Sequence, residues 1–319
     1  MRGVVTKLLV FVGAFLLAIA ALALFYAPDK VKRTPLDVDS VTRLTGEAQL
    51  FDGTALVTTP VKATSTAHAD SELSTDEVVL FQSSSCLVKD PDGQAPDCVS
   101  ADDPDNRLIS AGTEVFATDR HTAMAVNDFE NLPADAEPRE GLINKWPFDV
   151  EQKTYPYWDD LIGQPVDAVF QGTEDIDGLE SYEFLVSVKD GDIEITDGVP
   201  GKYSSEKTIW VDPTTGSILD QSESQTRVQT DNGQTLLQLD FSFTDATVAA
   251  NVEEAKANTS RLNLLTKTVP LVGGLVGLLA LIAGLILWRT SPAVRGEQVP
   301  AQDVTLDEMS DAGTRRRAR

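Results

Sequence analysis

The chain has 319 residues, and its 26 Lys and Arg against 50 Asp and Glu give a formal net charge of −24 at neutral pH. This balance excludes a broad nucleic-acid-binding role, because neutralising phosphates requires clustered cations. With two His and two Cys in the whole chain, zinc clusters, histidine-based triads and iron–sulfur centres are nearly excluded.

A short basic segment, residues 1–7, precedes an uncharged apolar stretch of 18 residues from Leu8 to Phe25. As a helix this stretch spans about 27 Å, enough to cross the core of a bilayer. A cleaved signal peptide is the alternative, because Ala21-Leu22-Ala23 resembles a processing site. Secretory apolar cores usually run only about 7–15 residues, so we expect an uncleaved transmembrane helix over residues 8–26.

A second apolar stretch runs from Pro270 to Trp288 and predicts another membrane-spanning helix over residues 269–288. Each stretch contains a pair of small residues four apart, Gly273 with Gly277 and Ala14 with Ala18. Close antiparallel packing of the two helices is therefore sterically possible.

Cations flank the outer ends of both stretches: Arg2, Lys7, Arg289, Arg295, Arg315, Arg316, Arg317 and Arg319. The positive-inside rule then predicts a plasma-membrane protein with both termini cytoplasmic and a large extracytoplasmic, periplasmic domain. Lys30, Lys32 and Arg33 oppose this orientation, but the long domain after them weakens their effect. Residues 27–268 hold 18 cations and 45 anions, a net charge of −27, which suits a soluble domain.

Period-two alternation of apolar and polar residues dominates the middle of the chain. Residues Tyr182–Val188 and Leu237–Phe243 alternate as half-buried strands do. Residues Thr208–Leu219 predict a hairpin, with Asp212-Pro213 opening the turn and Gly216 supplying a positive φ. Weaker strand candidates lie at 41–51, 78–81, 114–118 and 166–171.

These patterns predict a mainly β, α+β fold: an antiparallel, β-barrel-like ectodomain over residues 27–245 with short helices, flanked by two transmembrane helices. A lipid-facing barrel fits poorly, because the spanning signal lies in apolar helices rather than in amphipathic strands. Residues 246–268 predict a stalk helix that leads to the second span. Residues 289–319 predict a disordered cytoplasmic tail.

Cys86 and Cys98 enclose eleven residues rich in turn formers. A disulfide that closes this loop is plausible in an oxidising compartment. A pair of free, buried thiols is the alternative. A redox-active pair is less favoured, because the spacing is not that of a Cys-x-x-Cys motif.

Signals for catalysis and metal binding are weak. His68 and His121 are isolated histidines of the kind that are usually solvated or structural. Three acidic runs, at 90–93, 102–106 and 174–178, lack the full ligand set of a calcium loop, so solvated turns are favoured. We therefore predict no catalytic residue, no metal site and no cofactor.

The most individual stretch of the chain is aromatic and broken by prolines. Its five aromatic residues lie within thirteen positions: Trp146, Phe148, Tyr155, Tyr157 and Trp158. Pro147 and Pro156 prevent a regular helix, so an extended, rigid segment is expected. The aromatic residues either plug the end of the barrel as ordinary core or line the mouth of an apolar cavity, where they contact the polar head of a ligand.

Several segments together resemble a family of actinobacterial two-span membrane proteins of undefined function, called PorA-like. They are the WPFD segment at 146–149, the TYPYWD segment at 154–159, the EDIDGL run at 174–179 and the WVDPTTG hairpin at 210–216. The resemblance covers nearly the whole chain. The architecture in turn looks like that of the class B scavenger receptors, whose β-barrel ectodomain encloses an apolar tunnel between two terminal spans.

The resemblance implies envelope lipid or lipoglycan handling in the periplasm of a mycolate-bearing actinobacterium. We therefore expect a membrane-anchored protein that binds or transfers an envelope lipid or lipoglycan and contacts membrane lipids and envelope biosynthetic proteins. The alternative is a scaffold for an envelope biosynthetic complex. Pore formation and hydrolase activity are less favoured, because two helices cannot enclose a water-filled pore and no catalytic motif is present.

Overall fold

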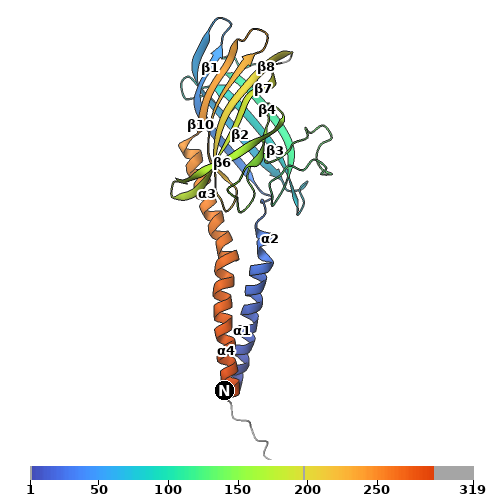
Figure 1. The fold of residues 1–319 in the computed structure, drawn as a ribbon, viewed down its shortest axis with the longest axis vertical. Coiled ribbons are helices and arrows are strands. Elements are labelled where there is room, and N and C mark those ends of the chain that lie inside the picture. The colour runs from blue at the N-terminus through green and yellow to red at the C-terminus, as the bar shows by residue number, and fades with distance from the viewer. Residues whose placement is uncertain (1, 197, 291–319) are drawn as a thin grey trace, which may run out of the picture. The chain divides into compact units, whose positions relative to one another are not determined.

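A computed structural model describes residues 2–196 and 198–290 (Figure 1). Most of the predicted tail, from residue 291 onward, lies outside the described residues. The described chain forms two compact units. One consists of the two terminal segments, up to Ala18 and from Gly273, and the other is the central segment Ile19–Val272.

The terminal unit is built from the greater part of two long apolar helices, α1 (Arg2–Phe25) and α4 (Val269–Arg289). Both are long and apolar enough to cross a membrane, and large apolar side chains are exposed along them. The helices run antiparallel and approach closely where small residues meet. A Cβ on Gly13 would lie 2.8 Å from the carbonyl oxygen of Gly277. Gly277, from the predicted small-residue pairs, is thus at the contact, and its counterpart is Gly13.

The central unit contains one antiparallel sheet of ten strands, in the order β4-β3-β2-β1-β10-β9-β8-β7-β6-β5. The strands are β1 (Asp39–Phe51), β2 (Leu56–Asp70), β3 (Val78–Lys89), β4 (Leu108–Asp119), β5 (Tyr155–Asp159), β6 (Gln164–Ile176), β7 (Leu179–Thr196), β8 (Val199–Val211), β9 (Ile218–Gln229) and β10 (Thr235–Phe243). The chain therefore forms two meanders that are joined by the pairing of β1 with β10, in which Leu44 lies opposite Phe243.

The predicted mainly β fold with terminal helices is confirmed, and each predicted strand is present. The predicted hairpin is formed by β8 and β9, and Gly216 in its turn has a φ of 74°. The sequence did not predict two of the strands, β2 and β5. β2 is rich in Thr and Ala, so its alternation is weak, and β5 contains Pro156.

The two faces of the sheet differ in polarity. Along β1, the buried residues Leu44 and Ala48 alternate with the exposed residues Thr45, Glu47 and Gln49. The outer face of this strand therefore suits water rather than acyl chains, unlike the face of a transmembrane barrel.

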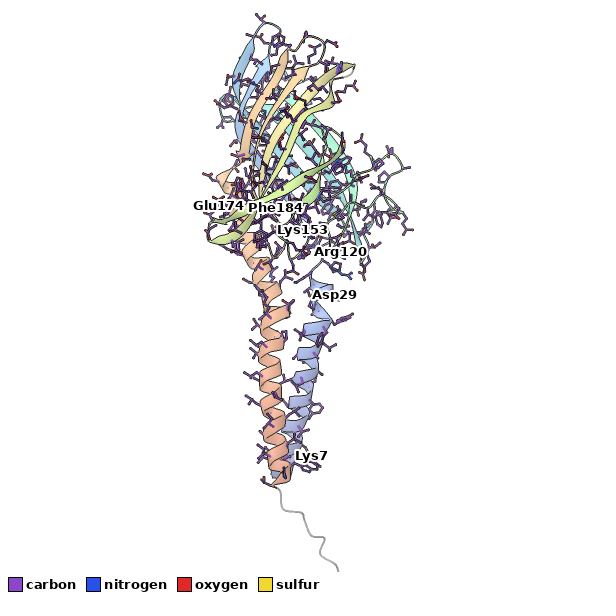
Figure 2. The ribbon with its side chains drawn as sticks, viewed as in Figure 1. Lys7, Asp29, Arg120, Lys153, Glu174 and Phe184 are labelled. Carbon is purple, nitrogen blue, oxygen red and sulfur yellow. A yellow bond between two sulfur atoms is a disulfide. The ribbon has the colours of Figure 1, made fainter. Side chains whose placement is uncertain are left out.

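The inner face of the sheet carries the core. Around β5–β8, the fully buried Trp146 and Phe184 pack together with 5.2 Å between their ring centroids and an angle of 33° between their planes. Figure 2 labels Phe184. Large aromatic side chains of this kind contribute much of the apolar area that a domain buries.

The edge strands β4 and β5 are linked by two short segments of the long β4–β5 connection. Single β-bridges join Thr118 of β4 to Ala125, Met124 to Leu142, and Leu142 to Tyr157 of β5. The amide of Leu142 donates to the Pro156 carbonyl at 2.8 Å, and its carbonyl accepts from Trp158 at 2.7 Å. Backbone hydrogen bonds therefore close the sheet at this end.

Helix α3 (Asp245–Asn263) follows β10 and continues through η1 (Leu264–Thr268) into α4. Thr244 caps α3, because its side chain accepts from the Thr247 amide. Val252 and Ala255 of α3 pack against Leu219 at the start of β9. The helix is therefore held against the β8–β9 hairpin.

Cys86 of β3 and Cys98 form the predicted disulfide. It closes the loop after β3, where Cys86 packs with Val88 and Ala95. The alternative of two free thiols is excluded.

Candidate functional site

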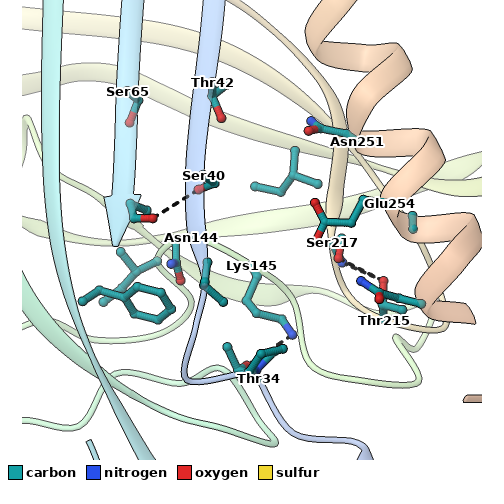
Figure 3. Close-up of a pocket in the computed structure, with 18 of the residues that line it drawn as sticks. Thr34, Ser40, Thr42, Ser65, Asn144, Lys145, Thr215, Ser217, Asn251 and Glu254 are labelled. Carbon is teal, nitrogen blue, oxygen red and sulfur yellow. Dashed lines mark hydrogen bonds between the residues drawn. The ribbon is translucent and has the colours of Figure 1, made fainter. Parts of the chain in front are cut away.

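A cavity of about 580 Å³ lies in the central unit (Figure 3). The inner face of β1 and β2 lines one side with Ser40, Thr42 and Ser65, and α3 lines another with Asn251 and Glu254. Its volume falls in the range of about 300–1,000 Å³ that is usual for small-molecule sites.

The cavity has an apolar side, built from segments that are far apart in the sequence: Leu44, Phe81, Phe116, Ile143, Phe148 and Phe243. Phe81 and Phe116 stack with 5.4 Å between their centroids, so these two rings pack together in this wall. An apolar lining with a few polar groups is the usual composition of a ligand pocket.

One part of the cavity is lined by segments that adjoin the apolar helices in the sequence. Val31 ends the short helix α2 (Ala27–Val31), which begins two residues after α1 ends. Leu265 belongs to η1, which leads directly into α4. Helices α2 and η1 contact each other. The lining of the cavity therefore includes the segments of the central unit that adjoin α1 and α4 in the sequence.

A lysine without an acidic partner lines the cavity. The ammonium of Lys145 donates to Thr34 Oγ1 at 3.3 Å and lies 4.1 Å from the centroid of the Phe148 ring (Figure 3). In the described part of the chain, no carboxylate forms an ion pair with it. Loss of surrounding water lowers the pKa of Lys145 from 10.5 to about 7, although the charge of Asp212 acts in the opposite direction.

The carboxylate of Asp212 is occupied by other groups. It accepts from the Thr215 amide at 3.0 Å, from Thr215 Oγ1 at 2.5 Å and from Thr259 Oγ1 of α3 at 3.1 Å. These bonds hold the β8–β9 turn against α3. The carboxylate therefore has a structural role beside Lys145.

Asn144, the neighbour of Lys145, also lines the cavity. Its Oδ1 is buried and has no hydrogen-bond partner among the described residues. Leaving a buried polar atom unpaired costs about 1–3 kcal/mol, so such an atom calls for an explanation.

A second charged group lies on the β4 side of the cavity. Arg139 is buried and lies 2.8 Å from Glu114 and 3.2 Å from Asp160, and both carboxylates line the cavity. Burial and the charge of Glu114 raise the pKa of Asp160 to about 6, although Arg139 opposes this rise.

The inside of the barrel around β8 and β9 is filled by a buried polar cluster. Glu223 accepts from Tyr203 at 3.2 Å and from Ser205 at 3.1 Å, and it lies 3.3 Å from the ammonium of Lys207. Lys207 in turn lies 5.6 Å from the ring centroid of Tyr157. These four side chains fill this part of the interior and do not line the cavity, whereas Tyr157 does.

The structure separates the five aromatic candidates. Phe148 and Tyr157 line the cavity. Trp146 and Tyr155 pack in a core cluster with Leu142 and Phe184, and Trp158 packs in another with Phe81 and Phe116. Tyr157 belongs to the same core cluster as Trp146 and Tyr155, so Phe148 is the one of the five that lines the cavity without being part of a buried core cluster.

Sequence reasoning missed Asn144 and Lys145, although both directly precede Trp146, the first residue of the aromatic segment. The available signal was a lysine inside an apolar run, between Ile143 and Trp146. A charged residue at such a position is rarely buried unless it has a partner or a function.

The fold defines a class: a β-barrel-like domain whose chain begins and ends in helices that are apolar enough to cross a membrane. The chain belongs to the Porin PorA family, whose profile matches residues 5–286. It is 24% identical to Porin PorA of Corynebacterium resistens, over 90% of this chain and 97% of that relative. The expected PorA-like membership is thus confirmed, and it fits a membrane or envelope protein.

Proposed function

We propose that this protein is an envelope lipid- or lipoglycan-binding and transfer protein, held in the plasma membrane by α1 and α4 with both termini cytoplasmic. Its barrel domain lies outside the membrane and takes the apolar part of the ligand into the cavity. It then passes the ligand to envelope biosynthetic proteins. The cavity, with its apolar side and its extension to α2 and η1, is the observation that carries the proposal.

The lining residues support an amphiphilic ligand. Leu44, Phe116 and Phe243 offer an apolar wall, and each methylene moved from water onto such a wall stabilises binding by about 0.8 kcal/mol. Ser40, Thr42 and Ser65 offer hydroxyl groups on the same strands. A lipid that enters from the membrane would meet Val31 and Leu265 first, because these residues belong to the segments next to the spans.

Pore formation is the second candidate, because the C. resistens relative is named Porin PorA. Two observations favour binding over conduction in this chain. The outer face of β1 is polar, and the interior beside β8 and β9 is filled by side chains such as Tyr203 and Glu223. A water-filled pore requires a continuous lumen, which one pair of helices cannot enclose.

The test is to identify the lipids that remain on the full chain after purification in detergent. We compare the wild type with Thr42→Trp, which fills the cavity, by mass spectrometry of the bound lipids. Thr45→Trp is the matched control, because Thr45 lies three residues away on the exposed face of the same strand.

A lipid that is enriched on the wild type and on Thr45→Trp, but lost from Thr42→Trp, is the expected result. Equal retention by a folded Thr42→Trp would overturn the assignment of the cavity. If the wild type holds only the bulk lipids of the membrane, the scaffold function becomes the better explanation. Conductance across planar bilayers, unchanged by Thr42→Trp, would favour the pore.

A further inference from the structure

The charged and polar groups of the cavity differ in how far partners within the protein satisfy them. Arg33 lines the cavity but lies 3.2 Å from Glu77. Glu114 and Asp160 are both paired with Arg139. Lys145 has no acidic partner among the described residues and donates only to Thr34, and Oδ1 of the adjacent Asn144 has no hydrogen-bond partner there.

We propose that Lys145 and Asn144 form a head-group site for a phosphodiester lipid that carries a free hydroxyl group, an inference that rests on the proposed function. The ammonium of Lys145 binds the phosphate, and Asn144 Oδ1 accepts a hydrogen bond from the hydroxyl. The acyl chains lie along the apolar side of the cavity.

The surroundings of Lys145 suit an anion better than a neutral group. The ring of Phe148, 4.1 Å away, stabilises and orients the ammonium through its π face. Thr34 takes one of the three N–H groups, so the remaining donors are available to a ligand. The nearby carboxylate of Asp212 acts on Lys145 through its charge, but its hydrogen bonds go to Thr215 and Thr259 and not to the ammonium.

The unpaired oxygen of Asn144 adds a second requirement, because it needs a donor. A phosphate oxygen is an acceptor and cannot satisfy it, whereas a glycerol or sugar hydroxyl can. Together the two residues therefore select a head that holds both an anion and a hydroxyl group. Phosphate alone satisfies one residue, and a neutral glycolipid satisfies the other.

The proposed head-group site lies next to the apolar side of the cavity. Ile143 and Phe148, which stand on either side of the two polar residues in the sequence, both belong to the apolar lining. A lipid whose chains contact these residues thus has its head beside Lys145. The phosphate of the ligand then provides the negatively charged partner that Lys145 does not have in the protein.

The experiment uses the full chain in detergent after its bound lipids have been exchanged. Three lipids with identical acyl chains compete for it: diacylglycerol, which has no phosphate; phosphatidylethanol, which has a phosphodiester and no head hydroxyl; and phosphatidylglycerol, which has both. Native mass spectrometry gives the bound ratio. Glycerol 3-phosphate, added alone, tests whether the head binds without chains.

We expect the wild type to prefer phosphatidylglycerol over diacylglycerol by about tenfold, the usual effect of one charge-assisted hydrogen bond. Lys145→Gln should bring this ratio to about one without changing the total amount of bound lipid. Lys145→Arg, which keeps the charge, should retain the preference of the wild type. Asn144→Leu should remove the preference for phosphatidylglycerol over phosphatidylethanol. Lys202→Gln, which removes a charge paired with Asp192 outside the cavity, is the control.

The outcomes separate the two proposals. If the wild type binds none of the three lipids, the proposed function fails. If it binds all three equally, the head-group site is wrong and the lipid-binding cavity stands. A preference that survives in folded Lys145→Gln would overturn the role of Lys145. Saturable binding of glycerol 3-phosphate without any lipid would assign the site to soluble phosphates instead.

Discussion

Lys145→Met tests whether the ammonium in the cavity lowers the free energy of unfolding of the protein. Methionine keeps the flexible, apolar stem beside Phe148 and removes the charge, and so it should stabilise the lipid-free protein. The pKa of Lys145 falls from 10.5 to about 7. At about 1.4 kcal/mol per pKa unit, a fully buried group would cost nearly 5 kcal/mol, and the partial exposure of Lys145 reduces the expected gain to about 2 kcal/mol.

The lowered pKa of Lys145 also predicts the direction in which the stability of the wild type changes with pH. Between pH 7 and 10.5 the unfolded lysine binds a proton that the folded lysine releases, so the stability of the wild type should rise with pH in this window. Lys145→Met should lack this part of the rise and should be more stable than the wild type at pH 7. A gain of about 2 kcal/mol corresponds to an increase in Tm of about 4–8 °C.

The assay is thermal unfolding of the delipidated full chain in detergent at pH 7 and pH 10, followed by circular dichroism. Lys202→Met is the matched control, because Lys202 is exposed and paired with Asp192. A lower Tm for Lys145→Met at pH 7, or a slope with pH equal to that of the wild type, would refute the reasoning.

Three further predictions follow from separate features. The raised pKa of Asp160, about 6, means that the folded state loses stability as pH rises from about 4 to 6, and Asp160→Asn should flatten this loss in a pH series of unfolding curves. Gly13→Leu should lower the Tm of the full chain in detergent, because Gly277 leaves no room for a side chain, whereas Gly3→Leu meets nothing within 4 Å and should be neutral. An unchanged Tm for Gly13→Leu would exclude close helix packing. Cys98→Ser should cost about 3 kcal/mol in the free energy of unfolding, since the disulfide closes a short loop, and added reductant should destabilise the wild type and not the variant.

Local patterns predicted the parts of the fold that local physics determines. The two spans follow from apolar length, and the strands around Phe184 and Leu239 follow from alternation. Strand β2 was not predicted, because Thr and Ala occur on both of its faces and leave little difference in polarity between the inner and the outer face. The disulfide was predictable because its two cysteines are close in the sequence and no others compete.

The site depends on long-range proximity, which no local pattern contains. Lys145 meets Thr34 across 111 positions of the chain, and α3 meets the β8–β9 turn through Thr259 and Asp212. The aromatic segment was recognisable as special. Its division into wall and core was not, because the prolines remove the periodicity that would tell which side of the segment Trp146 and Phe148 occupy.

The pairing of β1 with β10 has a consequence for how the protein folds. Each meander consists of neighbouring hairpins and forms from contacts that are local in sequence. Joining the meanders requires the two ends of the barrel domain to meet, a closure whose entropy cost grows with the length of the intervening chain. In the proposed topology α1 and α4 hold those two ends at one membrane surface, which raises their effective concentration. We therefore expect a barrel domain cut from α1 and α4 to join its two meanders more slowly than the full chain does.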